Sequence, residues 1–406
     1  MSAISHALSG VKVAEFGAYA AGPHIGKMLA TFGATVVHVE SHQRPDGFRG
    51  EYPPFKDGRV GPNRGGCFAI FNDSKYGVTL DLKQTAGIEL AQRLMGWADI
   101  IIENMRPEVM SRLGLGYETA SKLNPGVVMI SSCNMGQTGP RAQTPGFGSQ
   151  LSAMAGFCGL TGSPDEPPML LYGPYIDFIA STLGATAVLA ALDRQRRTGQ
   201  GAWVDMAQYE SGLMFIAGAL LDHHTTGASA DRSRNSDPNA APHDAYQCRN
   251  GQWLALSCWS DDEFRRLAEV LGHPGLAADP RFTTLDLRKA NGPALDAIVT
   301  PWALVQDAGA VAVLLQSARV HAYPVNTIAD LFRDPQLSYR RIWRRRLHGV
   351  IGDTSCYYSA FDLSDTPGDV MAAAPLIGAD NELVFQDFVG LTGQQYADYR
   401  DRGAFA

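Results

Sequence analysis

The 406-residue sequence lacks the local patterns of several large enzyme classes. It contains no GxSxG segment, which disfavours a serine hydrolase with a nucleophile elbow. It also has no HExxH segment and no Cys/His cluster with the spacing of a metal site. The GxxxxGK(S/T) phosphate loop is missing too, so ATP-driven ligation has no visible machinery. The chemistry of a side-chain carboxylate is the simplest proposal that survives these absences.

Paired cysteines and long uninterrupted apolar runs are missing as well. The six cysteines are scattered and form no CxxC pair, so we expect reduced thiols of a cytoplasmic protein and no disulfide framework. The first residues have neither a basic start nor an apolar core, so no signal peptide is expected. Gly, Pro or polar residues interrupt the apolar runs, so we expect no membrane span.

Basic residues are outnumbered, because 34 Lys and Arg face 41 Asp and Glu and give a net charge of −7. No basic stripe compensates, so nucleic acid is not expected as a partner. The one concentration of positive charge is the arginine cluster of residues 340–346. We interpret it as a solvated or subunit-contacting face, with an anion contact as the alternative. Hydrophobic residues at 45% and charged residues at 18% are typical of a globular protein, and the length suggests two or three domains.

The first forty residues have the pattern of a strand, a helix and a second strand. Residues 11–16 and 35–40 are the predicted strands, and residues 24–32 form the helix between them. The turn of residues 17–23 consists mostly of small residues, which lets a ligand approach the backbone. Because this turn is not GxGxxG, it indicates a dinucleotide site based on Glu40 only weakly.

Strand-like and helix-like runs continue to alternate along the chain, which predicts an α/β fold. Strands are predicted at residues 78–82, 100–102, 127–131 and 203–206, and helices at 84–97, 107–113 and 208–221. A polar stretch at 225–242 precedes a mixed α/β region, with a strand at 253–257 and helices at 261–271 and 308–319.

Asp177 is the candidate for carboxylate chemistry. It follows a Gly-Pro turn and directly precedes the apolar run of residues 178–192, which predicts a position at the start of a largely buried helix. The positive end of the helix dipole should keep the carboxylate ionised, held by backbone N–H groups. Two interpretations remain open at this point: a helix N-cap that satisfies amide groups, and a nucleophile at the edge of the core.

The order of short motifs along the chain resembles CoA-transferase family III, the formyl-CoA and carnitine CoA-transferase type, whose superfamily includes α-methylacyl-CoA racemase. Each motif is weak alone, but their shared order covers nearly the whole chain. The motifs are Asp177 and residues 8–16 with 21–23, 78–83, 103–107, 112–116, 123–125, 136–140, 197–201, 324–326, 334–337 and 375–378.

The resemblance implies a fold and an assembly. We expect a large Rossmann-like α/β domain built from residues 1–224 and 325–406, with a smaller α/β domain at 225–324 between them. Ring-shaped subunits of this family interlock into dimers, so we expect a homodimer, or a heterodimer with a related subunit.

The resemblance also implies a reaction in which CoA moves from an acyl-CoA donor, such as succinyl-CoA, to a free carboxylic acid. Asp177 matches the nucleophile, which forms an aspartyl anhydride and then an aspartyl-CoA thioester. No metal is implied. Coenzyme A enters as substrate and product thioester, and its contacts carry over to Ala18, Tyr19, Ala20, Ala21, Leu80, Lys83, Asn104, Met105, Arg106, Arg112 and Phe147, with Arg112 next to the adenosine phosphates.

Several positions depart from the family pattern. Ser41 follows Glu40 where a basic residue is common, and Arg44 is a candidate replacement. Gly148 stands where a carboxylate is usual, and Phe147 stands where racemases carry a histidine. A glycine-rich loop has no equivalent at residues 235–239. We therefore expect an aromatic pocket for a larger hydrophobic or aryl acid, lined by Tyr19, Phe147, Tyr172, Tyr175 and Phe178.

Two alternatives remain. An acyl-CoA racemase or epimerase on the same fold would need a second base near Asp177, and Phe147 offers none. A non-catalytic subunit that pairs with a related active chain would not need Asp177 to be intact.

Overall fold

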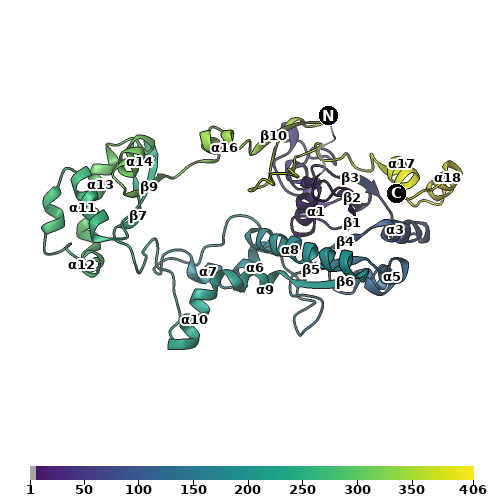
Figure 1. Ribbon diagram of the computed structural model, residues 1–406, viewed down its shortest axis with the longest axis horizontal. Helices are drawn as coiled ribbons and strands as arrows, with labels where there is room; N and C mark the ends of the chain where they lie inside the picture. The colour runs from purple at the N-terminus through teal and green to yellow at the C-terminus, as the bar shows by residue number, and fades with distance from the viewer. Residues whose placement is uncertain (1–5) are drawn as a thin grey trace. The chain divides into compact units, whose positions relative to one another are not determined.

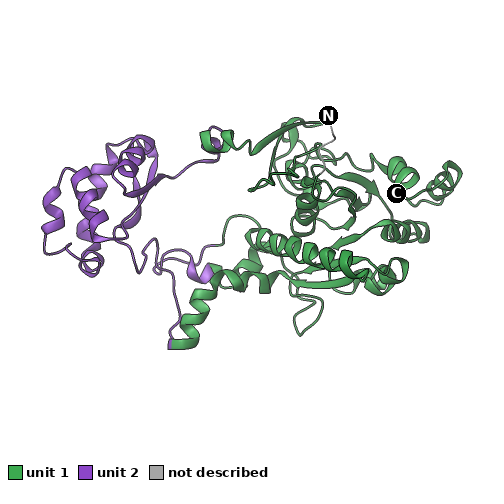
Figure 2. Cartoon of the chain, viewed as in Figure 1, with its two compact units in different colours: residues 1–157, 170–225, 335–406 green, residues 158–169, 226–334 purple. Residues whose placement is uncertain are grey.

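The computed structural model describes residues 6–406, which separate into two units (Figures 1 and 2). Unit 1 comprises the chain up to residue 157 together with residues 170–225 and 335–406. Unit 2 comprises residues 158–169 and 226–334. Residues 158–169 and 325–334 thus group with unit 2, whereas the sequence analysis assigned them to the large domain.

Six parallel strands form the sheet of unit 1, in the order β3-β2-β1-β4-β5-β6. This is the strand order of doubly wound α/β sheets, in which ligands bind beyond the carboxyl ends of the strands where the order reverses. Here the order reverses between β1 and β4. The strands are β1 (Lys12–Phe16), β2 (Thr35–Glu40), β3 (Tyr76–Thr79), β4 (Ile100–Glu103), β5 (Val128–Cys133) and β6 (Ala202–Ala207).

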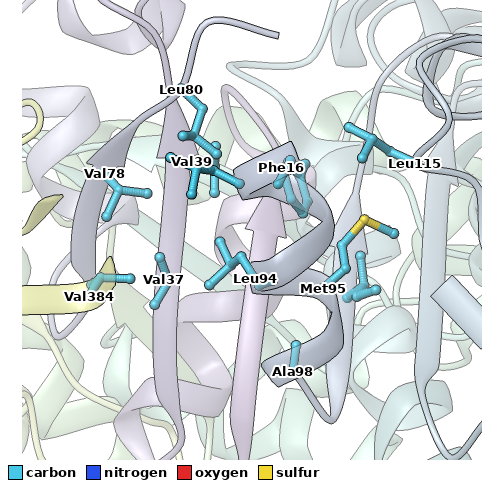
Figure 3. Close-up of a cluster of buried hydrophobic side chains, with 14 of the residues drawn as sticks. Phe16, Val37, Val39, Val78, Leu80, Leu94, Met95, Ala98, Leu115 and Val384 are labelled. Carbon is cyan, nitrogen blue, oxygen red and sulfur yellow. The ribbon is translucent and has the colours of Figure 1, made fainter. Parts of the chain in front are cut away.

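Helices cover both faces of this sheet, which is why the central strands read as nearly continuous apolar runs. One face packs against α1 (Ala21–Thr31) and α8 (Tyr175–Thr198), and the other packs against α3 (Thr85–Trp97) and the C-terminal segment. Successive strand residues point to opposite faces, so Val13 packs in the hydrophobic cluster with α1 and α8 (the first cluster), and Ala14 packs in the cluster with α3 (the second cluster). Figure 3 shows the second cluster, where Val37, Val39 and Phe16 of the strands meet Leu94 and Met95 of α3.

The apolar helix α8 is long and apolar enough to cross a membrane by length and composition, which the sequence analysis did not expect. The bent pair α13 (Gly292–Leu304) and α14 (Ala308–Ser317), which turns by 120° at its break, also passes if it is counted as one span. The core helix of a globular protein passes the same test. Since α8 packs on α1, β5 and β6, it has the contacts of such a core helix.

An antiparallel hairpin of β10 (Trp343–His348) and β11 (Gly352–Tyr357) was not foreseen from the sequence. It carries most of the arginine cluster. Arg344 and Arg346 share Asp369, at 2.8 and 3.2 Å, and Arg345 pairs with Asp353. Much of the positive charge is therefore neutralised locally.

Other helices of unit 1 are short and follow or precede the strands. They include α2 (Gly66–Phe71), α4 (Val109–Arg112), α5 (Tyr117–Leu123), α6 (Gly148–Met154), α9 (Gln208–Leu213), α10 (Ala217–Thr226), α16 (Pro335–Tyr339), α17 (Asn381–Leu383) and α18 (Gly393–Asp401). The short helix α7 (Phe157–Leu160) begins at the last residue of the first segment of unit 1.

Unit 2 has its own hydrophobic core between an antiparallel sheet and helices. The sheet has the order β7-β8-β9. The almost fully buried Arg288 links two segments of this unit by donating hydrogen bonds to the carbonyl oxygens of Ala241 and Phe282. The elements are β7 (His243–Gln247), β8 (Trp253–Ser257), β9 (His321–Pro324), α11 (Asp261–Val270), α12 (Leu285–Ala290), α13, α14 and α15 (Ile328–Leu331).

Candidate active site

Two cavities of unit 1 lie at the carboxyl ends of its strands. The larger has a volume of about 530 Å³, and the smaller, which contains Asp177, has a volume of about 300 Å³. They share four lining residues, Tyr19, Asn104, Met105 and Arg106. These residues follow β1 and β4, the two strands between which the order reverses, so both cavities lie where a doubly wound sheet binds its ligands.

The turn after β1 is held in place by Asn104. Its Oδ1 accepts a hydrogen bond from Ala18 N at 2.8 Å, and its Nδ2 donates to Ala18 O at 2.8 Å. A methyl group at Gly17 or Gly22 would lie 3.0 Å from Oδ1 of Asn104, so small residues in the turn allow this close approach. The amide of Asn104 is therefore occupied in shaping the wall between the two cavities.

The larger cavity combines an apolar lining with cationic side chains. Leu80, Leu82 and Val109 are among its apolar residues, and the exposed residues Arg44 and Lys83 also line it. This chemistry suits an extended ligand with an anionic part, because guanidinium and ammonium groups pair with phosphates. Ser41 and Arg44 both lie in its wall.

Most of the sequence-predicted CoA contacts come together at this cavity, and some do not. Ala20 and Ala21 are buried and line neither cavity, and Ala20 packs in the cluster that contains Phe48. Arg112 is exposed at the end of α4 and also lines neither, while Phe147 lines the smaller cavity. Those that line the larger cavity are Ala18, Tyr19, Leu80, Lys83, Asn104, Met105 and Arg106.

Asp177 lies in the first turn of α8 but does not cap it. The N-cap residue of α8 is Pro174, and no side chain caps the helix there. Oδ2 of Asp177 is buried and has no hydrogen-bond partner among residues 6–406. Burial raises the pKa of the Asp177 carboxyl to about 7, and its own backbone N–H offsets this only in part. The expectation of an ionised carboxylate held by backbone N–H groups is met only in part, because the N–H of Asp177 favours the charged form but the loss of solvation outweighs it.

Gly148 provides the space that the Asp177 carboxylate occupies. A methyl group at position 148 would overlap Oδ2 of Asp177. The glycine at position 148 therefore leaves room for the carboxylate of Asp177. Phe147 precedes it, half exposed, with its ring centroid 5.6 Å from that of Tyr19 in an edge-to-face arrangement.

The predicted five-residue aromatic pocket does not form around Asp177. Tyr19 and Phe147 line its cavity, but Tyr172 is fully exposed and lines none of it. Tyr175 packs against Phe157, and Phe178 packs against His24 and Phe71. The wall of the cavity is instead rich in polar side chains, namely Asn104, Asn134, Gln143, Thr144 and Gln208.

Sequence reasoning missed some residues of this site. Cys133, Asn134 and Gln208 line the Asp177 cavity, yet no local motif marks them. Buried charges beneath the turn were missed too, although they had a signal in the sequence. Glu15 and His38 interrupt the apolar runs of β1 and β2, and both are completely buried. A charged or polar residue within a buried strand indicates a paired network.

These observations define a doubly wound α/β protein with a ligand-sized cavity at the reversal of its strand order and, beside it, a carboxyl group with one unpartnered oxygen. The family model of CoA-transferase family III matches residues 8–381. The chain belongs to this family, which confirms the resemblance drawn from the motifs. No group of three or more His, Cys, Asp or Glu side chains that could hold a metal ion occurs within the described range 6–406.

Relatives agree with this assignment. The chain is 34% identical to succinyl-CoA–D-citramalate CoA-transferase of Chloroflexus aurantiacus over 394 residues, which cover 96% of both chains. It is 32% identical to succinate–glutarate CoA-transferase of Agrobacterium fabrum, over 82% of this chain and 83% of that one. Among solved structures, a CaiB/BaiF family protein from Brucella suis matches with a TM-score of 0.87 and 30% identity, over 95% of this chain and 100% of that chain.

Proposed function

We propose that this protein moves CoA from succinyl-CoA to a free carboxylic acid, with Asp177 as the nucleophile. The observation that carries the proposal is the buried, unpartnered Oδ2 of Asp177 in a cavity that shares its wall with the larger, cation-lined cavity. CoA occupies the larger cavity in this proposal. Its thioester passes Tyr19 and Met105 to reach the carboxylate.

The proposed reaction exchanges one acyl group for another without ATP. The Asp177 carboxylate attacks the thioester carbonyl, which releases CoA thiolate and forms a mixed anhydride. The thiolate attacks the aspartyl carbonyl, so the donor acid leaves and an aspartyl-CoA thioester remains. The acceptor carboxylate displaces the thiolate to form a second anhydride, and the thiolate then attacks the acceptor carbonyl. This last step releases the new acyl-CoA and restores Asp177.

The environment of Asp177 suits this role. A carboxyl group with a pKa of about 7 is ionised in a large fraction of molecules near neutral pH. Once ionised, it is more basic than an ordinary aspartate and is not masked by hydrogen bonds to Oδ2. Both the anhydride and the thioester hydrolyse, so a half-buried position that limits access of water also favours transfer.

Racemisation is less well supported, because a 1,1-proton transfer needs a second base. Besides Asp177, the titratable side chains that line its cavity are Tyr19, Arg106 and Cys133. Burial raises the pKa of Tyr19 to about 12, with Glu51 adding to the effect, and burial raises the pKa of Cys133 to about 12. Both are protonated at neutral pH, and Arg106 is a permanent cation. A non-catalytic subunit is disfavoured by the intact Asp177.

A dicarboxylic acid is the acceptor that the cavity favours. Arg106 lines the cavity of Asp177 and is exposed, so its guanidinium is available to a second carboxylate. The two relatives named above act, by their names, on citramalate and glutarate. A larger hydrophobic or aryl acid has weaker support, since only Tyr19 and Phe147 of the five expected aromatic residues line the cavity.

A second subunit completes the proposed assembly. Unit 1 exposes large apolar side chains along residues 214–221, among them Met214, Phe215 and Leu221, each more than half exposed. Contiguous exposed apolar surface marks interaction sites. We therefore propose an interlocked dimer of ring-shaped subunits, made of two copies of this chain or of this chain and a related one. All six cysteines are unpaired, which favours the cytoplasm.

The test is a transfer assay with succinyl-CoA and a panel of free acids, without ATP, read by mass spectrometry of the CoA esters. The panel pairs dicarboxylic acids such as glutarate and citramalate with benzoate and phenylacetate. We expect CoA esters of dicarboxylic acids, with succinate released in equal amount. If no acid of a broad panel receives CoA, or if transfer requires ATP, the proposed function is wrong. If only aryl acids react, the proposed acceptor class is wrong and the transfer activity stands.

A further inference from the structure

The turn that separates the two cavities is held at both ends by buried charged groups. At one end, the N–H of Tyr19 donates to Asp46, at 3.2 Å from Oδ1 and 3.1 Å from Oδ2. At the other end, Nζ of Lys75 donates to the carbonyl oxygen of Pro23 at 2.7 Å. Asp46 and Lys75 are 3% and 5% exposed. Lys75 lies behind the turn and lines neither cavity, whereas the buried Asp46 also contributes to the lining of the larger cavity.

These two ends belong to a single chain of contacts. Lys75 Nζ lies 2.8 Å from Oε1 of Glu15, and the same Oε1 lies 2.7 Å from Nδ1 of His38. Nε2 of His38 in turn lies 3.9 Å from Oδ2 of Asp46 and has no hydrogen-bond partner among the described residues. Such a set of charges is costly to bury, and it is retained where it specifies one arrangement.

Tyr19 adopts a backbone conformation that needs external support. Its φ is +62°, in the left-handed region that non-glycine residues rarely adopt. The Asp46 carboxylate accepts its N–H, and the Tyr19 hydroxyl donates to Oε2 of Glu51 at 2.9 Å. A methyl group at Gly47 would overlap the Tyr19 ring, so the loop that carries Asp46 is shaped around that ring.

The ring of Tyr19 consequently stands between the two cavities and lines both. It contacts Phe48 on one side and Phe147 on the other, with centroid distances of 5.5 and 5.6 Å. Phe48 N also donates to Oδ1 of Asp46 at 2.8 Å. One carboxylate thus fixes the backbone of Tyr19 and that of a residue packed against its ring.

We propose that Asp46 is a positioning residue for the transfer reaction, because it holds Tyr19 in the left-handed conformation in which its ring directs the thioester from the CoA cavity to Asp177. This inference rests on the proposed function. Asp46 acts through Tyr19 and forms no bond with the reacting atoms. Burial raises the pKa of Asp46 to about 6, although His38 and the N–H groups of Phe48 and Tyr19 lower it, which is consistent with a carboxylate held at some cost for this purpose.

A double-mutant cycle tests the inference, with Asp46→Asn, Tyr19→Gly and the combined variant. Asn keeps the size of Asp46 but loses its charge, so we expect kcat to fall about tenfold, while the dissociation constant of free CoA changes less than about threefold. Glycine adopts a positive φ freely, so Tyr19→Gly removes the need for support together with the ring. In that background Asp46→Asn should lower kcat by less than about twofold.

Two further variants keep the cycle interpretable. Asp307 caps α14 in unit 2 by accepting from Ala310 N at 3.0 Å, so Asp307→Asn removes the charge of a capping aspartate that lines neither cavity. It should leave kcat at the wild-type value. Gly47→Ala leaves the charged network intact and crowds the Tyr19 ring, so it should lower kcat even if Asp46→Asn fails to fold.

The inference is overturned if the effects of Asp46→Asn and Tyr19→Gly multiply, or if Asp46→Asn transfers CoA at the wild-type rate. Should Asp46→Asn not fold, an unchanged kcat in Gly47→Ala overturns it instead. A wild-type protein without transfer activity overturns the proposed function together with this inference. An active wild type with multiplying effects removes only the role of Asp46.

Discussion

Two carboxyl groups in unit 1 have opposite environments: that of Glu15, which is completely buried, and that of Asp177, whose Oδ2 is buried. Glu15 receives Lys75 at 2.8 Å and His38 at 2.7 Å. Burial alone would raise the pKa of Glu15, but Lys75 and His38 outweigh it and the pKa lies below its usual value. Oδ2 of Asp177 has no such partner, and burial raises its pKa to about 7. At Glu15 the two cationic partners offset the cost of burying a carboxylate, whereas at Asp177 no side chain of the described residues offsets it.

This difference separates a structural group from a reactive one. A paired carboxylate holds its neighbours and is not free to attack a substrate. An unpaired carboxylate in a cavity costs stability, and such groups persist where they serve chemistry. Substitutions at Glu15 and Asp177 test this difference, because one should affect mainly stability and the other mainly activity.

Asp177→Asn should have the largest effect, a fall in CoA transfer on the order of 10³-fold or more, because an amide cannot form the anhydride. Stability should not fall. The folded pKa of about 7 lies above the usual 3.8, so burying this carboxyl destabilises the folded state increasingly as the pH rises from about 3.8, and the cost is fully present above pH 7. A neutral amide removes this cost, which is at most about 4 kcal/mol at pH 8.

Urea unfolding at pH 8 measures the free energy of unfolding, and the transfer assay measures the activity of the same preparation. Activity above a tenth of the wild type, or a clear loss of stability, would contradict the assignment of Asp177 as the reactive partner in the comparison.

Glu15→Gln should show the reverse pattern. It leaves the ammonium of Lys75 buried without a countercharge, so the free energy of unfolding should fall by about 3–5 kcal/mol. The molecules that remain folded should keep an intact Asp177. Glu89→Gln is the matched control, since Glu89 pairs with Arg402 at 3.0 Å on the surface and should change stability by less than about 1 kcal/mol. Equal stabilities of the two variants would refute the distinction.

Gly148→Ala tests whether Asp177 needs the space that it occupies. The added methyl group would overlap Oδ2, and a displaced nucleophile should lower kcat by about 10²-fold with little change in acyl-CoA binding. Gly146→Ala is the control from the same cavity, because its methyl group would lie at an ordinary 3.6 Å from Asn134. The spatial argument fails if the two variants are equally active.

The dependence on pH should distinguish the same two carboxyl groups. For Asp177, whose folded pKa is about 7, kcat/KM should fall about fivefold between pH 7 and pH 6 and level off above pH 8. For Glu15, whose folded pKa is lowered, the stabilisation is present at neutral pH and is lost as the pH falls through its folded pKa. Activity should therefore decline before the protein unfolds. A flat rate from pH 5 to 8 would contradict this order.

The smallest expected effect is at the rim of the larger cavity. Arg44→Ala should raise the KM of acyl-CoA about three- to tenfold at low salt and leave kcat unchanged, because an exposed guanidinium attracts phosphate without touching the reaction. The difference should shrink at high salt. Arg340→Ala, a change outside the lining of the larger cavity, is the control. An unchanged KM would show that Arg44 does not replace the basic residue that the family pattern has at the position of Ser41.

Local patterns were sufficient for much of the fold. The alternation of apolar runs and turns located all six strands of the large sheet to within a few residues, because buried parallel strands and their crossover helices have strong local signals. The hairpin of β10 and β11 was missed, because its arginines read as a surface cluster and its pairing depends on residues outside the run.

The site was predictable in position and not in environment. Asp177 was placed correctly at the start of a helix, but its contact with Gly148 joins two distant segments and has no local signal. The same holds for Glu15, whose partners His38 and Lys75 are 23 and 60 residues away in the chain. Arg112 matched a motif, yet the short helix α4 carries it away from both cavities.

The most direct test of the central claim is to trap the acylated carboxylate. Wild-type protein is mixed with succinyl-CoA, quenched with borohydride or hydroxylamine and analysed by peptide mass spectrometry, with Asp177→Asn treated in parallel. The account predicts modification at Asp177 that depends on the acyl-CoA and is lost in the variant. An unmodified Asp177 in a preparation that transfers CoA would contradict it.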